Sequence, residues 1–188
     1  MDPSLSLTQV WFERLLLAVG FGLLFLGAFR LNETMNEWVL YGQGIALLFV
    51  PAGVKNVAIM VGRAWGALGV SVALYWLTFD FWHNTSPMAN LMYCVASVGS
   101  SFVGVELGLR WFQIDRGLCN LRFWHLPLLD LITTTVHGVT TNVYFIVSGM
   151  KDSDFVSNTL AMMVGDYLGN FLIMSALFVV LRVRRWLR

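Results

Sequence analysis

The chain contains 188 residues, of which 57% are hydrophobic and only 12% are charged, and its formal net charge is +1. Soluble domains carry about 25% charged residues because their surface faces water. Together with a mean hydropathy of +0.70, these values exclude an ordinary soluble domain, a disordered chain, a secreted disulfide scaffold and a nucleic-acid-binding protein. The composition predicts an all-α, polytopic integral membrane protein whose first partner is the lipid bilayer.

Six stretches are long and apolar enough to cross about 30 Å of hydrocarbon as helices. They cover residues 11–29, 38–61, 64–79, 88–112, 126–147 and 155–181. The connections between them are short, which leaves no room for a separate soluble domain. We therefore expect a single transmembrane helical bundle over residues 1–188.

Basic residues are distributed unevenly between the two sides of this predicted bundle. Only Arg30 and Lys151 lie on one side, and Lys55 lies inside a span. The other side receives Arg14, Arg63, Arg110, Arg116, Arg122, Arg182, Arg184, Arg185 and Arg188. Because Lys and Arg near span ends favour the cytoplasmic side, we expect both termini in the cytoplasm of a bacterial-type inner membrane protein.

Polar residues follow helical spacing along one face of each of the last two spans. The first of these stripes contains Asp130, Thr133, Thr134, His137, Thr141 and Tyr144, and the second contains Thr159, Met163, Asp166 and Asn170. Polar side chains facing lipid would lack partners, so the stripes should face each other or a shared cavity. Buried ionisable residues in membranes indicate function, and His137 is a candidate proton or ligand contact because the histidine side chain ordinarily titrates near neutral pH.

The second predicted span is interrupted by Pro51 and Gly53, and we expect a kink or break there because proline removes a backbone donor. Lys55 follows this break and is a candidate counter-ion for Asp166 or Asp130, or for an anionic ligand. The ligand-binding or proton-sensing residues predicted here, called the polar seam below, are Lys55, Asp130, Thr134, His137, Thr141, Asp166 and Asn170.

A structural interpretation of the same residues stays open. Threonine and asparagine in membrane helices commonly hydrogen-bond to their own backbone or to a neighbouring helix. His137 would then be a satisfied buried imidazole, and Lys55 would extend to the cytoplasmic interface. Glu106 is expected to pair with Arg110 one turn later on the same helix.

Two small-residue motifs predict close contacts between helices. One joins Gly104 to Gly108, and the other joins Gly165 to Gly169 on either side of Asp166. The sequence contains no metal-binding, phosphate-binding or nucleophile motif of the familiar kinds. It therefore predicts no enzymatic activity, no metal site and no cofactor.

The stretch from Gly44 to Trp76 resembles the membrane-associated sensor domain that precedes histidine kinase and cyclic-di-GMP enzyme modules in bacteria. Its matching residues are Pro51, Gly53, Gly62, Trp65 and Gly69. The last span is similar to that family's last helix at Gly165, Asp166 and Gly169, and Leu129 and Asp130 open the preceding helix in a similar way. The resemblance implies a shortened, stand-alone sensor, without an output domain after Arg188, which acts through another protein.

These observations favour a membrane sensor or small-ligand-binding module with a protein partner. Two alternatives remain at the level of sequence. The size and topology are similar to those of the substrate-binding component of energy-coupling-factor transporters, in which Ala18 and Gly22 would form a docking face. The chain is also suited to be an accessory subunit of a larger membrane complex.

Overall fold

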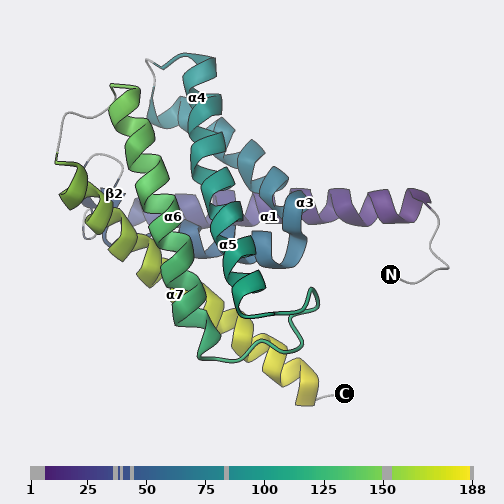
Figure 1. The fold of residues 1–188 in the computed structure, drawn as a ribbon. Coiled ribbons are helices and arrows are strands. Elements are labelled where there is room, and N and C mark those ends of the chain that lie inside the picture. Colours follow the sequence, from purple (N-terminus) through teal and green to yellow (C-terminus); the bar gives the residue numbers. More distant parts are fainter. Residues whose placement is uncertain are drawn as a thin grey trace.

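The computed structural model describes residues 7–35, 38, 40–42, 45–82, 85–149 and 154–186, so Lys151 and Arg188 lie outside the described residues. Nearly all of the described chain is helical (Figure 1). The helices are α1 (Leu7–Thr34), α3 (Val50–Phe81), α4 (Pro87–Cys94), the π-helical segment η1 (Val95–Gly99), α5 (Ser100–Trp111), α6 (His125–Val147) and α7 (Phe155–Trp186). Strands β1 (Leu40–Gly42) and β2 (Ile45–Ala46) form a short antiparallel hairpin. The expected all-α class is confirmed.

Four helical stretches of the described chain are long and apolar enough to cross a membrane. They are α1, α3, the run from Pro87 to Trp111 that joins α4, η1 and α5, and α7 as far as Val183. Helix α6 is not among them although it has 23 residues, because its polar stripe lowers its hydropathy. It lies between α5 and α7, against which it packs (Figure 1).

The prediction of a helix over residues 38–61 is wrong for its first part, which contains the β1–β2 hairpin. Helix α3 begins only at Val50, and Pro51 lies in its first turn. A proline at this position loses no hydrogen bond, since the first backbone N–H groups of a helix have no partner within it. The expected break near Pro51 is therefore the start of a helix rather than a kink within one.

Helix α3 is divided at Arg63, which has the non-helical angles φ 51° and ψ −132°. Its two parts, residues 50–62 and 64–81, fold back on each other, since a Cβ atom at Gly66 of the second would overlap the carbonyl oxygen of Ala58 in the first. At 1.5 Å per residue the first part is about 20 Å long, too short to cross about 30 Å of hydrocarbon by itself.

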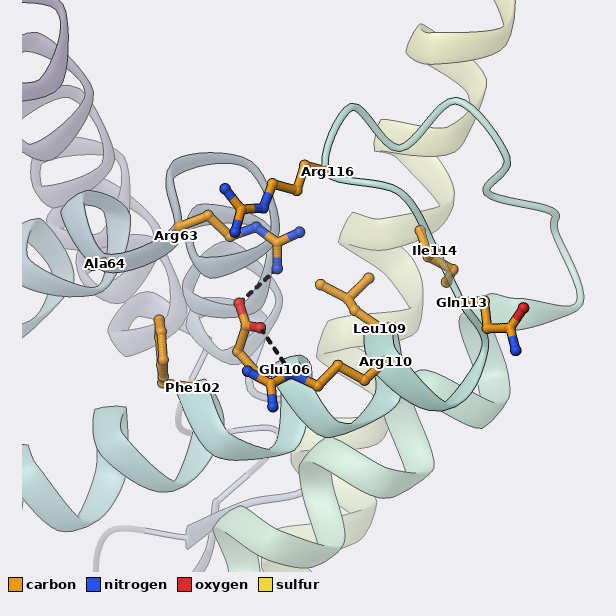
Figure 2. Close-up of a pocket in the computed structure, with 9 residues that line it drawn as sticks. All are labelled: Arg63, Ala64, Phe102, Glu106, Leu109, Arg110, Gln113, Ile114 and Arg116. Carbon is orange, nitrogen blue, oxygen red and sulfur yellow. Dashed lines mark hydrogen bonds and ion pairs between the residues drawn. The ribbon is translucent and has the colours of Figure 1, made fainter. Parts of the chain in front are cut away.

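Arg63 also ties this turn to α5, because its guanidinium donates to Glu106 at 2.6 Å (Figure 2). The expected pair between Glu106 and Arg110 is looser, at 3.9 Å. The main partner of Glu106 therefore comes from another helix, which spacing along a single helix could not predict.

Glycines allow the closest approaches between helices. A Cβ atom at Gly69 of α3 would overlap the carbonyl oxygen of Ala18 in α1. At the α5–α6 contact, a Cβ at Gly104 would lie 2.8 Å from the Cα of Thr133, and one at Gly108 would lie 3.2 Å from the Cγ of Leu129.

On α7, Gly165 and Gly169 face the segment that enters α3. A Cβ at Gly165 would overlap the carbonyl oxygen of Ala46, and one at Gly169 would overlap that of Phe49. A Cβ at Gly53 of α3 would lie 2.6 Å from the carbonyl oxygen of Gly169. These glycines bring the hairpin and the start of α3 directly against α7.

Candidate functional site

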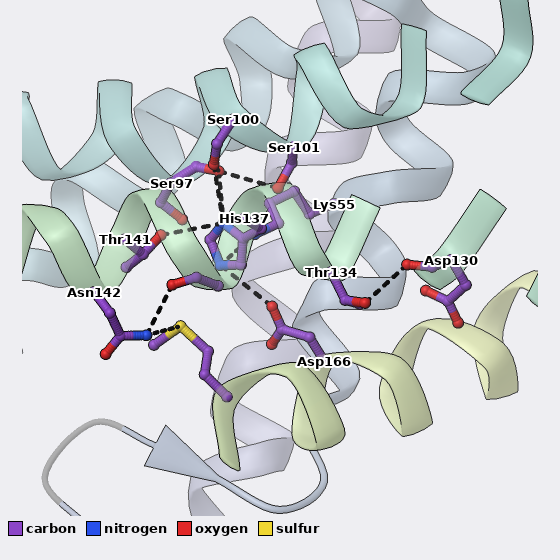
Figure 3. A network of polar contacts seen from close by, with 12 residues as sticks. Lys55, Ser97, Ser100, Ser101, Asp130, Thr134, His137, Thr141, Asn142 and Asp166 are labelled. Atoms are coloured by element: carbon purple, nitrogen blue, oxygen red, sulfur yellow. Dashed lines mark hydrogen bonds and ion pairs between the residues drawn. The ribbon is translucent and has the colours of Figure 1, made fainter. Parts of the chain in front are cut away.

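Lys55, His137 and Asp166 meet inside the bundle, where the first part of α3 approaches α6 and α7 (Figure 3). Their exposed fractions are only 3%, 5% and 4%, respectively. The Nε2 atom of His137 lies 3.3 Å from the Nζ atom of Lys55 and also 3.3 Å from Oδ2 of Asp166. A cation, an imidazole and a carboxylate thus share one buried position.

The other ring nitrogen of His137 faces helix η1–α5. Nδ1 lies 3.1 Å from the carbonyl oxygen of Ser97, 3.2 Å from Oγ of Ser100 and 3.3 Å from Oγ1 of Thr141. Because a carbonyl oxygen can only accept a hydrogen bond, we assign the hydrogen of the neutral ring to Nδ1, which then donates to Ser97. With this assignment Nε2 of the neutral ring is an acceptor.

The carbonyl of Ser97 belongs to the π-helical segment η1. Such segments widen a helix locally and are frequent at functional sites. Here the same carbonyl oxygen also accepts hydrogen bonds from the hydroxyls of Ser100 and Ser101, both at 3.0 Å. The irregular turn therefore concentrates polar groups at the point where the helix meets His137.

Each of two proton distributions provides a hydrogen bond at one of the two contacts of Nε2. In the first, the Lys55 ammonium donates to the neutral ring, and the Asp166 carboxylate balances its charge. In the second, the ring is protonated, donates to Asp166, and Lys55 is neutral. The proton can thus be bound to Lys55 or to His137 at the same net charge of the site. Uptake of one further proton would make the site cationic.

A cavity of about 50 Å³ adjoins these three groups. It is lined by Phe25, Phe29, Ile45, Ala46, Phe49, Lys55, Leu74, Tyr93, Ser97, His137, Met162 and Asp166. This volume suits a few water molecules or a small ion, whereas pockets for small organic ligands usually enclose about 300–1,000 Å³.

The structure separates two other members of the polar seam from this cluster. Asp130 and Asn170 lie against each other between α6 and α7, with exposed fractions of 0% and 1%. Within the described residues, neither the carboxylate oxygens of Asp130 nor the amide atoms of Asn170 form a well-oriented hydrogen bond.

Thr134 and Thr141 differ in what they contact. The hydroxyl of Thr134 donates to the carbonyl of Asp130 in its own helix at 2.9 Å, as the structural interpretation expects. Thr141 instead lies beside the ring of His137. Lys55 does not extend to an interface, because it is buried.

Ser97 and Ser100 contact His137 from the fourth predicted span and were not among the predicted site residues. A signal for them exists, because this span has a face of small residues at helical spacing, namely Ser97, Ser100, Ser101, Gly104 and Gly108. The position of the π-helical turn has no comparable signal in the sequence.

No group of three or more potential metal ligands occurs within the part of the chain that the structure describes. Comparison of the chain with protein-family models, curated proteins and solved structures gives no match. The geometry of the Lys55–His137–Asp166 cluster is therefore the evidence for what the protein does.

Proposed function

We propose that this protein is a membrane sensor module that responds to protons or a small ion at Lys55, His137 and Asp166 and acts through a protein partner. The observation that supports this most strongly is the contact of one imidazole nitrogen with both a buried cation and a buried carboxylate. A buried site with several proton distributions changes its charge on proton uptake. Uncompensated charge in a membrane interior is costly, so the surrounding packing must respond.

Asp166 lies next to the contact between α7 and the segment 45–50, so a change of packing at Asp166 would affect that contact. Its neighbour Gly165 accepts a hydrogen bond from the backbone N–H of Phe49 at 3.0 Å and packs against Ala46. A cationic site would therefore loosen the contact between α7 and the segment 45–50. The titratable groups around the imidazole are Lys55 from α3, Asp166 from α7 and Tyr93 from α4, which lines the same cavity.

We further propose that the chain crosses a bacterial inner membrane six times, with both termini in the cytoplasm. The β1–β2 hairpin and the first part of α3 would form the second crossing, and α6 the fifth. Arg63, Arg110 and Arg116 line one pocket at one end of the bundle. Arg30 binds Asp80 at the other end, and this asymmetry supports the orientation.

The cavity dimensions favour the sensor over a transporter component that holds a vitamin-sized substrate. An organic substrate of that kind needs a pocket several times larger than about 50 Å³. A transporter component would bind such a substrate tightly on purification. The sensor proposal instead predicts a response to pH without a bound organic molecule.

Hydrogen exchange in lipid nanodiscs tests the proposal. After correction for intrinsic rates, the wild-type protein should exchange faster in residues 45–50 at acidic pH than at neutral pH, because the cluster gains a proton. His137→Gln should abolish this difference. His125→Gln is the matched control, since His125 is also a buried histidine of α6. Equal pH dependence in the wild-type protein and His137→Gln would contradict the proposal.

A further inference from the structure

A second cavity of about 580 Å³ lies beside the turn of α3 and shares no lining residue with the cavity at His137. Figure 2 shows the side chains that line it. It is formed by the turn of α3, the end of α5 and the loop that follows α5. Its lining residues are Arg63, Ala64, Phe102, Glu106, Leu109, Arg110, Gln113, Ile114 and Arg116. This volume is within the range of pockets that bind small molecules.

The charges in this basic pocket favour an anion. Among the described residues that line it are three arginines and one acid, Glu106, which gives these residues a formal excess of two positive charges. Glu106 binds Arg63 closely, whereas Arg110 lies 3.9 Å from it with 82% of its side chain exposed. Arg116 is also exposed. Guanidinium groups bind phosphate oxygens through paired hydrogen bonds, so Arg110 and Arg116 are available for a phosphate group.

An apolar groove of about 610 Å³ continues from the basic pocket along the outside of the bundle. It runs between the second part of α3 and the α4–η1–α5 helix, and it shares Ala64 and Phe102 with the basic pocket. Its other lining residues are mostly apolar and include Leu68, Tyr75, Val95 and Gly99. From Ala64 to Tyr75 the groove follows about 16 Å of helix.

We propose that these two cavities together bind one anionic phospholipid. Its phosphate group binds in the basic pocket, which Arg110 and Arg116 line, and an acyl chain occupies the groove. A free phosphate compound would need only the basic pocket, and a neutral lipid would need only the groove. Because the two cavities share Ala64 and Phe102, one ligand can occupy both. An amphiphile with an anionic headgroup and an acyl chain matches them in shape and charge.

Binding is measured by native mass spectrometry on the delipidated full chain in a neutral detergent. The probes are dioleoyl phosphatidylglycerol, dioleoyl phosphatidylcholine and soluble glycerol phosphate. Phosphatidylglycerol should bind at least tenfold more tightly than either other probe. Equal affinity for the two lipids would overturn the proposal, because it would make the arginines irrelevant. Equal affinity for glycerol phosphate would also overturn it, because the site would then be one for free phosphate compounds.

The phosphate contact is tested with the double variant Arg110→Gln/Arg116→Gln. It should weaken phosphatidylglycerol binding about 30-fold, the loss expected for two basic contacts to an anionic lipid. Arg182→Gln is the control, because Arg182 is exposed on α7 outside the pocket. A double variant that binds like Arg182→Gln would contradict the proposed contact.

The groove is tested with Gly99→Leu. A Cβ atom at Gly99 meets no other atom within 4 Å, and Gly99 shares a helix face with Val95 and Phe102, which also line the groove. The added side chain should fill the groove without disturbing the fold, and weaken phosphatidylglycerol binding at least tenfold. Gly27→Leu is the control, since Gly27 is equally open but lies on α1. Unchanged lipid binding by Gly99→Leu would overturn the assignment of the acyl chain.

Discussion

Removing the charge of Lys55 should destabilise the protein strongly, and removing the charge of Asp166 as well should restore part of the loss. When the proton is on Lys55, Lys55→Met leaves the carboxylate of Asp166 buried without its cation. Asp166→Asn then leaves the ammonium of Lys55 buried without its carboxylate. Breaking a buried charge pair from one side costs about 3–5 kcal/mol. The double variant leaves neither charge unbalanced, so its cost should be less than the sum of the two single effects.

The size of this coupling follows from the geometry of the cluster. Nζ of Lys55 and Oδ2 of Asp166 each lie 3.3 Å from Nε2 of His137, so their separation is at most twice that distance. With an effective dielectric constant of about 20, the attraction at that limit is about 2.5 kcal/mol, and at about 4 Å it is about 4 kcal/mol. We therefore expect a coupling free energy of about 2–4 kcal/mol.

The coupling is measured as a double-mutant cycle of unfolding in mixed micelles with increasing fractions of denaturing detergent. Thr134→Val serves as a control, because the hydroxyl of Thr134 bonds only to its own helix. Its effect should be about 1 kcal/mol or less. Additivity of the Lys55 and Asp166 effects to within about 0.5 kcal/mol would refute the reasoning, since it would mean that the two charges do not interact.

Three further predictions concern the fold. Gly165→Ala should lower the free energy of unfolding by about 1–3 kcal/mol, because the added Cβ overlaps the carbonyl oxygen of Ala46. Gly27→Ala is the control at an open position and should not destabilise the protein. Equal losses of stability in the two variants would contradict the packing of α7 against Ala46. Arg63→Gly should be about 1–3 kcal/mol more stable than Arg63→Ala in the same unfolding assay. Both variants lose the Glu106 contact, but only glycine fits the positive φ of 51° without strain. Equal stability of the two variants would argue against strain at the turn. Cys119 is exposed in the loop between α5 and α6. It should react with a membrane-impermeant maleimide in inside-out vesicles but not in intact cells. Labelling of Cys119 in intact cells would contradict the proposed orientation.

The polar face of α6 was predictable from the sequence because helical periodicity alone determines it. Residues three, four and seven positions apart lie on one face, so Asp130 and His137 were expected to share one. A second stripe on α7 predicted where Asp166 would lie. The cost of burying ionisable groups in lipid then required these faces to meet, and the structure brings His137 and Asp166 into contact.

Other features depend on contacts between distant segments and were not predictable from local patterns. The apolar stretch before Val50 suits either a helix or a hairpin, and the close contact of Ala46 with Gly165 accompanies the hairpin. The turn at Arg63 was expected, because it separates the second predicted span from the third, but its positive φ of 51° was not, since such an angle is unusual for a residue other than glycine. The contact of Ser97 with His137 depends on a π-helical turn, whose register the spacing of residues does not reveal.

The protonation of His137 tests the central claim most directly. Nitrogen-15 NMR of the full chain, labelled at histidine, distinguishes the two ring nitrogens over about pH 5 to 9. Comparison with His137→Gln assigns the signals. We predict that Nδ1 carries a hydrogen throughout, that Nε2 gains one as the pH falls, and that Asp166→Asn changes the pH of this transition. A neutral ring with its hydrogen on Nε2, or a transition unaffected by Asp166→Asn, would contradict a proton-responsive cluster of Lys55, His137 and Asp166.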